Sequence, residues 1–359
     1  MEGTVSTMAT PFKTLAVCGP TASGKSGLGV DLARALHGEV VNVDSVQVYR
    51  DFSIGSAKIS VDEMQGVPHH LLDIFSPDKP ANVSEFRDTA LVALAEITAR
   101  EKVPVLVGGS GMYFTVLLHG LADVPPTPPS TREEVARIPA EEAYAELMRI
   151  DPETAARLHV HDRQRVTRAL EIYRVSGRAP SEIFREHQFK AVDVVSLLIV
   201  ICRPRDELYQ RIDQRSAEMV KAGLIEETSE LRARYGDVAL LDTLGYKQAR
   251  DYLDGGLARE EVAHEIALHT RRFAKRQMTF WRNEPGKRGW VTRPAEGEQG
   301  LEIEGFDSAP KRAQKRMVGF RAFEFTPEQI IEAARTRLRE PLERSEVWYV
   351  RVREEMKGP

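Results

Sequence analysis

The segment from Gly19 to Ser26 places small residues, a lysine and a serine in the spacing G-x-x-x-x-G-K-[ST]. Glycines in that spacing allow a tight turn whose backbone N–H groups surround an anion, and the lysine adds a positive charge for terminal phosphate oxygens. A serine hydroxyl after the lysine is a common ligand of the Mg²⁺ that accompanies a polyphosphate. We therefore predict a phosphate-binding loop with Ser26 as the Mg²⁺ ligand. The loop consists of Gly19, Pro20, Thr21, Ala22, Ser23, Gly24, Lys25 and Ser26.

A second chemical group, Asp44, follows the apolar run that begins at residue 39. At the end of a parallel strand its carboxylate would face the phosphate loop across a crevice, which suits a general base. A turn cap and an indirect Mg²⁺ ligand are the alternative interpretations. The next apolar run, 104–107, ends in Gly-Gly-Ser-Gly without the aspartate that a nucleotide hydrolase places there, which weakens a hydrolase interpretation.

The elements that position these groups alternate between strand and helix. Apolar runs at 15–18, 39–44, 104–107 and 194–202 predict strands, and a helical pattern such as 85–99 lies between two of them. This alternation predicts an α/β fold, a P-loop NTPase-like parallel sheet with helices on both faces. The carboxyl ends of its strands carry the candidate site residues.

The alternation is interrupted by a proline-rich segment, 124–130, after which the patterns are helical. Asp162 is the expected N-cap of a helix that Gly177 ends. We therefore predict an inserted all-helical domain. The expected domains are a core made of 14–119 and 191–290, the insertion 120–190, and a tail of unassigned role, 296–359. In the tail, a capping box at 326–329 predicts a helix. We also expect a strand at 346–352.

Composition sets the broad class of protein. The chain has 359 residues, of which 42% are hydrophobic and 29% charged, with a net charge of −4. No run approaches the roughly 18 apolar residues that span a bilayer, and no signal-type segment begins the chain, so we expect a cytoplasmic protein without membrane contact. The cysteines, Cys18 and Cys202, end predicted buried strands and are expected to act as small hydrophobic residues.

Basic residues gather between His264 and Trp290, opposed only by Glu265 and Glu284. This local excess either contacts RNA or forms the solvated face of an amphipathic helix, and the pattern alone leaves both open. The basic residues are Arg271, Arg272, Lys275, Arg276, Arg282, Lys287 and Arg288.

Eight blocks of sequence, taken in order, resemble the tRNA dimethylallyltransferase family over residues 14 to 290. The blocks are GPTASGKS at 19–26, DSVQVY at 44–49, IGSAK at 54–58, PHHLLDI at 68–74, VGGSGMYF at 107–114, RALEIY at 168–173, LGYK at 244–247 and KRQMTFWR at 275–282. The resemblance implies transfer of a dimethylallyl group from dimethylallyl diphosphate to N6 of the adenosine directly 3′ of the anticodon, in tRNAs that read codons beginning with U. It also implies Mg²⁺ as cofactor, the tRNA anticodon stem-loop as partner and a monomer.

The resemblance assigns roles to individual residues. Asp44 matches the family's base, and Lys25 and Ser26 complete the catalytic set. Thr21 and Arg271 are further candidates for diphosphate contact. The expected tRNA-binding residues are Asp44, Ser45, Val46, Gln47, Ser110, Tyr113, Gln164, Arg165, Arg168, Gly245, Lys247, Lys275, Arg276, Gln277 and Arg282. Without the resemblance, Tyr113 could equally be a core aromatic, and 164–168 a surface helix face.

The chain departs from the family pattern in three places. The insertion is shorter around 138–143, Ser110 stands where threonine is common, and the tail has no counterpart. The rival functions are an adenylate isopentenyltransferase, which prenylates a free nucleotide, a small-molecule or nucleotide kinase, and an RNA-binding module with a vestigial loop. The insertion and the basic C-terminal block argue against the first, and intact Lys25, Ser26 and Asp44 against the last.

Overall fold

The computed structural model describes residues 11–79, 81–187, 193–288, 291–292, 301–302, 321–342 and 345–352. The chain divides into two compact units: a core unit, Met1–Leu118 with Asp193–Pro359, and a helical unit, His119–Val192.

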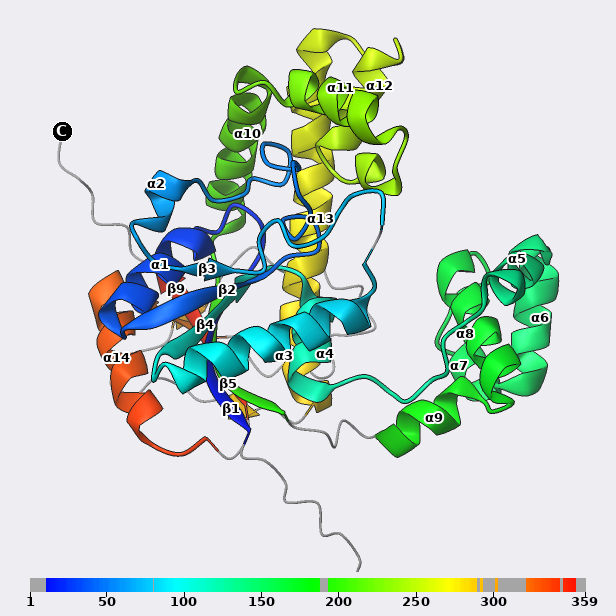
Figure 1. The fold of residues 1–359 in the computed structure, drawn as a ribbon, viewed down its shortest axis with the longest axis horizontal. Helices are drawn as coiled ribbons and strands as arrows, with labels where there is room; N and C mark the ends of the chain where they lie inside the picture. The colour runs from blue at the N-terminus through cyan, green and yellow to red at the C-terminus, as the bar shows by residue number, and fades with distance from the viewer. Residues whose placement is uncertain are drawn as a thin grey trace, which may run out of the picture. The chain divides into compact units, whose positions relative to one another are not determined.

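A largely parallel sheet forms the centre of the core unit (Figure 1). Within the described residues its strands lie in the order β3-β2-β4-β1-β5-β9-β8-β7, and β6 pairs with β9. The strands are β1 (Phe12–Cys18), β2 (Gly38–Val43), β3 (His69–His70), β4 (Val103–Gly108), β5 (Val194–Ile201), β6 (Val291–Thr292), β7 (Leu301–Glu302), β8 (Arg321–Phe325) and β9 (Glu346–Val352). The strands predicted at 15–18, 39–44, 104–107 and 194–202 are confirmed as β1, β2, β4 and β5.

Helices cover both faces of this sheet, as predicted. Alternate residues of β1 illustrate this, since Ala16 belongs to the hydrophobic cluster on one face and Leu15 to the cluster on the other. Strands buried on both faces are apolar at nearly every position, which explains why every residue of β5 except Ser196 is apolar. The helices of the core unit are α1 (Lys25–Ala35), α2 (Val61–Met64), α3 (Val83–Ala99), α4 (Gly111–His119), α10 (Arg205–Lys221), α11 (Leu224–Tyr235), α12 (Tyr246–Leu253), α13 (Arg259–Arg288) and α14 (Pro327–Arg339), with a 3-10 turn η1 (Ala239–Asp242).

The tail requires a correction, because its described part belongs to the core unit and not to a segment set apart from it. β9 pairs in parallel with β5, and the Ser196 N–H donates to the Ser345 hydroxyl over 3.1 Å. The capping box predicted at Thr326 is confirmed at the start of α14, which packs beside α1 (Figure 1). The reason is physical: without a neighbour, the apolar strand β5 would leave its backbone N–H and C=O groups on an open edge.

The helical unit contains only helices among its described residues. They are α5 (Pro129–Arg137), α6 (Ala140–Ile150), α7 (Pro152–Ala155), α8 (Arg163–Ser176) and α9 (Pro180–His187). The Asp162 side chain accepts from the Arg165 N–H, and Gly177 ends α8 with a φ of 68°, so both predicted caps are confirmed. A small core that includes Leu147 and Leu170 holds α5, α6 and α8 together.

No helix within the described part of the chain is both long and apolar enough to cross a membrane. Cys18 and Cys202 are both buried and unpaired, as expected for small hydrophobic residues at strand ends.

Candidate functional site

The loop from Gly19 to Ser26 joins β1 to α1, the strand–loop–helix context that its sequence predicts. Gly19 has a φ of 148° and Gly24 a φ of 91°. Residues that carry a Cβ rarely adopt such positive φ values, so glycine suits both positions. Gly24 is also the N-cap of α1, so the positive end of the helix dipole lies at the loop. The loop therefore has the geometry of an anion site.

Cationic side chains hold the carbonyl oxygens of this loop. The Arg203 Nε donates to the Ser23 carbonyl over 2.7 Å, and the Arg211 Nε donates to the Ala22 carbonyl over 2.9 Å. These arginines come from the segment that follows β5 and from α10, far along the sequence from the loop. They stabilise the loop and concentrate positive charge around it.

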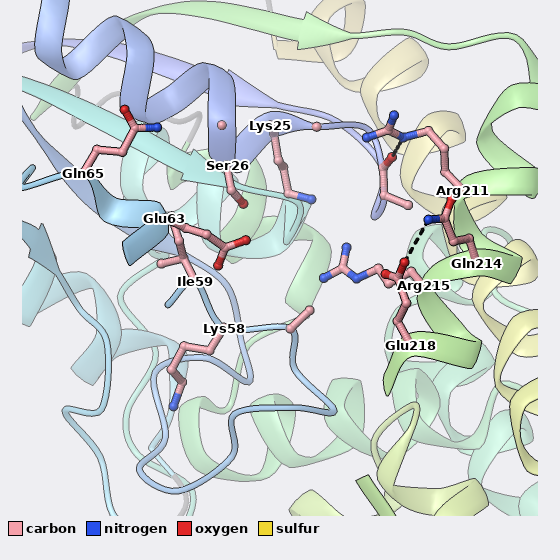
Figure 2. A pocket seen from close by; sticks show the side chains of 14 residues that line it. Lys25, Ser26, Lys58, Ile59, Glu63, Gln65, Arg211, Gln214, Arg215 and Glu218 are labelled. Carbon is pink, nitrogen blue, oxygen red and sulfur yellow. Dashed lines mark hydrogen bonds between the residues drawn. The ribbon is translucent and has the colours of Figure 1, made fainter. Parts of the chain in front are cut away.

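A pocket of about 580 Å³ opens beside the loop (Figure 2). In Figure 2 the Lys25 ammonium and the Arg215 guanidinium point into the same space, opposite the Glu63 carboxylate. Its lining combines cations with two carboxylates, which suits an anion that carries a metal ion. The lining residues are Ala22, Gly24, Lys25, Ser26, Gly27, Ala57, Lys58, Ile59, Glu63, Gln65, Arg211, Gln214, Arg215 and Glu218.

Lys25 has an unusual proton affinity for a lysine. Burial, and next the neighbouring Arg215 charge, lower the pKa of Lys25 to about 8, against the opposing effect of Asp44. Burial likewise lowers the pKa of Arg215, and the Asp44 and Glu63 carboxylates oppose that shift. Both cations have lost hydration, so an anion in the pocket would interact with them more strongly than in bulk water.

Asp44 follows β2 directly, as predicted, and its carboxylate acts as a turn cap. Its Oδ1 accepts from the Val46 N–H over 2.9 Å and from the Gln47 N–H over 3.2 Å. Within the described residues its Oδ2 accepts no hydrogen bond, so one oxygen remains for a proton. Asp44 is not a lining residue of the pocket, but its charge acts on Lys25 and Arg215. The cap and the base interpretations are therefore compatible.

The turn after β4 lies next to Asp44. The Ser45 N–H donates to the Ser110 hydroxyl over 3.2 Å, which joins the ends of β2 and β4. Tyr113, in the first turn of α4, packs on Phe86 with ring centroids 4.2 Å apart and is only 9% exposed. Burial raises the pKa of Tyr113 to about 12, with smaller contributions from Tyr49 and Asp44. The expected tRNA contact of Tyr113 is therefore corrected: its ring is a core aromatic.

Two glutamines that the resemblance assigns to tRNA binding make hydrogen bonds within the protein. The Gln47 amide donates to the Ser56 and Ala57 carbonyls over 3.0 and 3.1 Å, so it holds the loop before the pocket residue Lys58. Gln277 of α13 is 8% exposed and hydrogen-bonded at both ends of its carboxamide. A helical pattern cannot show that a polar residue faces inward to meet distant loops.

Arg271 does not reach the pocket. Its guanidinium pairs with both carboxylate oxygens of Asp213 on α10 and lies 5.3 Å from the Tyr209 ring centroid. The diphosphate contact predicted for Arg271 is thus not supported by its position. Arg211 and Arg215, which sequence reasoning missed, line the pocket in its place. Their spacing of four on an amphipathic helix after a buried strand was the available signal.

The remaining tRNA candidates of the core unit lie on α12 and α13. Lys275 and Arg276 are exposed, and the Arg276 guanidinium lies 5.6 Å from the Phe273 ring centroid. Arg282 is half-buried, and its charge acts on Cys202. Gly245 is the buried N-cap of α12, and Lys247 is exposed on that helix.

On the helical unit, Gln164, Arg165 and Arg168 are all exposed on α8. Arg165 pairs with its cap Asp162 over 3.1 Å, and Arg168 donates to Thr127 over 2.8 Å and pairs with Glu171 over 3.0 Å. The start of α8 thus presents an accessible polar surface, in which two arginines are paired with carboxylates.

The histidine pair His69–His70, in a block of the family pattern, has structural contacts. His70 Nε2 lies 2.7 Å from Glu39 Oε2, and His69 Nδ1 lies 2.9 Å from the Val67 carbonyl. Hydrogen bonds from Arg100 and His70, with Arg100 the larger effect, lower the pKa of Glu39. These contacts join β3 to β2 at the sheet edge.

Comparison with known proteins gives one consistent family. The family model described as IPP transferase matches residues 47–284, more than half of the chain. The chain is 45% identical over 275 residues to tRNA dimethylallyltransferase 1 of Citrifermentans bemidjiense, covering 76% of this chain and 90% of the relative. It is 43% identical to tRNA dimethylallyltransferase of Myxococcus xanthus, covering 75% of this chain and 89% of the relative.

Solved structures agree with these relatives. A tRNA isopentenylpyrophosphate transferase from Bacillus halodurans is 39% identical with a TM-score of 0.55, covering 76% of this chain and 87% of the other. A eukaryotic dimethylallyltransferase, described as acting on tRNA, is 28% identical with a TM-score of 0.67, covering 75% of this chain and 69% of the other.

Proposed function

The chain belongs to the IPP transferase family and is a tRNA-modifying prenyltransferase, and we propose that it transfers the dimethylallyl group of dimethylallyl diphosphate to an anticodon-loop adenosine. The acceptor is the exocyclic N6 of the adenosine directly 3′ of the anticodon, in tRNAs that read codons beginning with U. The observation that carries the proposal is a glycine-rich anion loop bordered by a cationic pocket, with the Asp44 carboxylate within electrostatic reach of both.

The reaction replaces one bond to the allylic carbon by another. The N6 lone pair forms the new N–C bond while the C–O bond to diphosphate breaks, and its electron pair leaves with the diphosphate. The N6 proton passes to the Asp44 Oδ2, and the cap through Oδ1 holds the carboxylate in place. This step needs the two reactants in line and the leaving charge stabilised.

The leaving diphosphate is assigned to the loop and the pocket beside it. Backbone N–H groups at the start of α1 and the side chains of Lys25, Arg211 and Arg215 supply positive partial or full charges there. The bonds from Arg203 and Arg211 to loop carbonyls keep this arrangement preorganised before substrate binds.

We also propose Mg²⁺ as the cofactor of the diphosphate. The exposed Ser26 hydroxyl lines the pocket with the Glu63 and Glu218 carboxylates, so the donors present are the hard oxygens that Mg²⁺ prefers. Within the described residues, no group of three or more His, Cys, Asp or Glu side chains could hold a metal ion. Such a site fits an ion held largely by substrate phosphate oxygens. When bound, Mg²⁺ would spread the charge of the leaving diphosphate.

tRNA is proposed to contact the core unit through Ser45, Lys275 and Arg276 and the helical unit through α8. Their exposure supports this, and an unstacked adenosine would be received beside Asp44, where the Ser45–Ser110 hydrogen bond joins the turns after β2 and β4. We propose a monomer that acts in the cytoplasm, where tRNA is available.

Incubation with labelled dimethylallyl diphosphate tests the proposal against its rivals. We expect label in an anticodon stem-loop with adenosine 3′ of the anticodon, and none when guanosine replaces it. Label in AMP instead would indicate an adenylate isopentenyltransferase. Turnover of ATP with no prenyl transfer would indicate a kinase, and either result would refute the proposed function.

A further inference from the structure

The side chain of Gln277 joins two loops of the candidate site. Its Oε1 accepts from the Thr21 N–H over 2.9 Å, and its Nε2 donates to the Gly109 carbonyl over 3.0 Å. Both ends of the carboxamide are therefore used, and the reversed orientation would place donor against donor and acceptor against acceptor. The two partners thus fix how the side chain is oriented.

The two loops lie next to different groups of the proposed reaction, the leaving diphosphate and the base Asp44. Thr21 belongs to the loop assigned to the leaving diphosphate. Gly109 immediately precedes Ser110, whose hydroxyl accepts from the N–H of Ser45, the neighbour of Asp44. One carboxamide therefore extends from the leaving-group loop to the turn beside the base. It also takes the Thr21 N–H, which is then not available to a phosphate.

This contact is tightly packed. A Cβ at position 109 would lie 2.5 Å from the Gln277 Nε2 and 3.1 Å from the Gly19 carbonyl oxygen, so a side chain there would displace the Gln277 carboxamide from its present position. The helix that carries Gln277 is also held in place, because Trp281 packs edge-on against Phe114 of α4 with centroids 5.3 Å apart. A rigid helix with a fixed carboxamide can set a distance between two loops.

We infer that Gln277 is a positioning residue that sets the separation between the diphosphate loop and the turn beside Asp44. The inference rests on the proposed function for the roles of the two loops. A shift of about 1 Å in such a separation can lower the rate of an aligned reaction by about 100-fold. Gln277 thus acts through the loops and not through contact with tRNA.

The test uses two variants. Gln277→Leu removes both hydrogen bonds. Gln277→Glu keeps an acceptor for the Thr21 N–H but places a carboxylate oxygen against the Gly109 carbonyl oxygen, which repels it. The matched control is Gln210→Leu, the same change at an exposed site on α10. Thermal unfolding first establishes that each variant is folded, and Gln277→Glu carries the test if Gln277→Leu is not.

Single-turnover transfer at saturating tRNA is expected to fall at least about tenfold in both Gln277 variants, with the tRNA Kd within about twofold of wild type. Inorganic pyrophosphate, titrated by calorimetry, should bind about tenfold more weakly. Normal single-turnover rates with a raised tRNA Kd would overturn the inference and indicate that Gln277 contacts tRNA. Wild-type behaviour of both variants would also overturn it.

Failure of the proposed function would be seen separately, since the wild-type protein would then show no prenyl transfer. The pyrophosphate titration still decides the role of Gln277 in that case. Unchanged pyrophosphate affinity in both variants would then overturn the positioning role.

Discussion

Lys25 and Asp44 are coupled electrostatically although they follow β1 and β2, strands that β4 separates in the sheet. Burial and the Arg215 charge lower the pKa of Lys25 to about 8, and the Asp44 carboxylate acts against them without cancelling their effect. The two residues proposed for leaving-group binding and proton removal thus influence each other before any substrate binds.

The lowered pKa of Lys25 predicts a pH dependence of diphosphate binding. Below about pH 8 the ammonium is charged and attracts the diphosphate, and above it the charge is lost, so affinity should decrease by up to about tenfold per pH unit. Calorimetric titration with pyrophosphate from pH 7 to pH 10 measures this. Because arginine stays charged, the affinity of Lys25→Arg for pyrophosphate should change with pH only through the protonation of pyrophosphate itself. Equal slopes of affinity against pH in the two proteins would contradict the assignment.

Replacing Asp44 by Asn should abolish transfer without disturbing the turn. The Asn oxygen can still accept from the Val46 and Gln47 N–H groups, but it cannot take the N6 proton. We expect a loss of about 10²- to 10⁴-fold in single-turnover rate. The tRNA Kd and the thermal midpoint should stay near wild type, and a normal rate would remove Asp44 from the mechanism.

Charge reversal on α13 should weaken tRNA binding because fewer RNA phosphates are then neutralised. For Lys275→Glu/Arg276→Glu we expect a smaller salt dependence of the tRNA Kd, with a slope reduced by about 0.7 for each phosphate that the variant no longer neutralises. Lys102→Glu/Arg339→Glu is the control, with the same charge change on residues that precede β4 and end α14. A salt titration indistinguishable from wild type would show that the basic face of α13 is only solvated.

The tail should contribute to stability through β9. Trp348 is 6% exposed and packs in the hydrophobic cluster shared with α1 and α14, so Trp348→Ala should lower the free energy of unfolding by about 3–5 kcal/mol. Urea unfolding measures the change. Val92→Ala, at a side chain that is 58% exposed, should cost under about 0.5 kcal/mol. Similar costs for both would mean that β9 is not part of the stable core.

The local features of the protein could be predicted from its sequence. The loop from Gly19 to Ser26, the strand before it and the caps of α8 follow from glycine spacing, apolar runs and polar residues at helix ends. These signals depend on neighbours within a few residues, so they can be recognised without knowing the fold. The position of Asp44 after β2 follows from the same reasoning.

Only the tertiary structure decided which distant side chains complete the site. Arg211 reaches the loop while Arg271 pairs with Asp213, and Gln277 turns inward to join two loops. A helical pattern separates a buried face from a solvated one, but it does not say which backbone group meets a given side chain. That depends on how α10 and α13 pack against the sheet, and on contacts between residues more than a hundred positions apart in the chain.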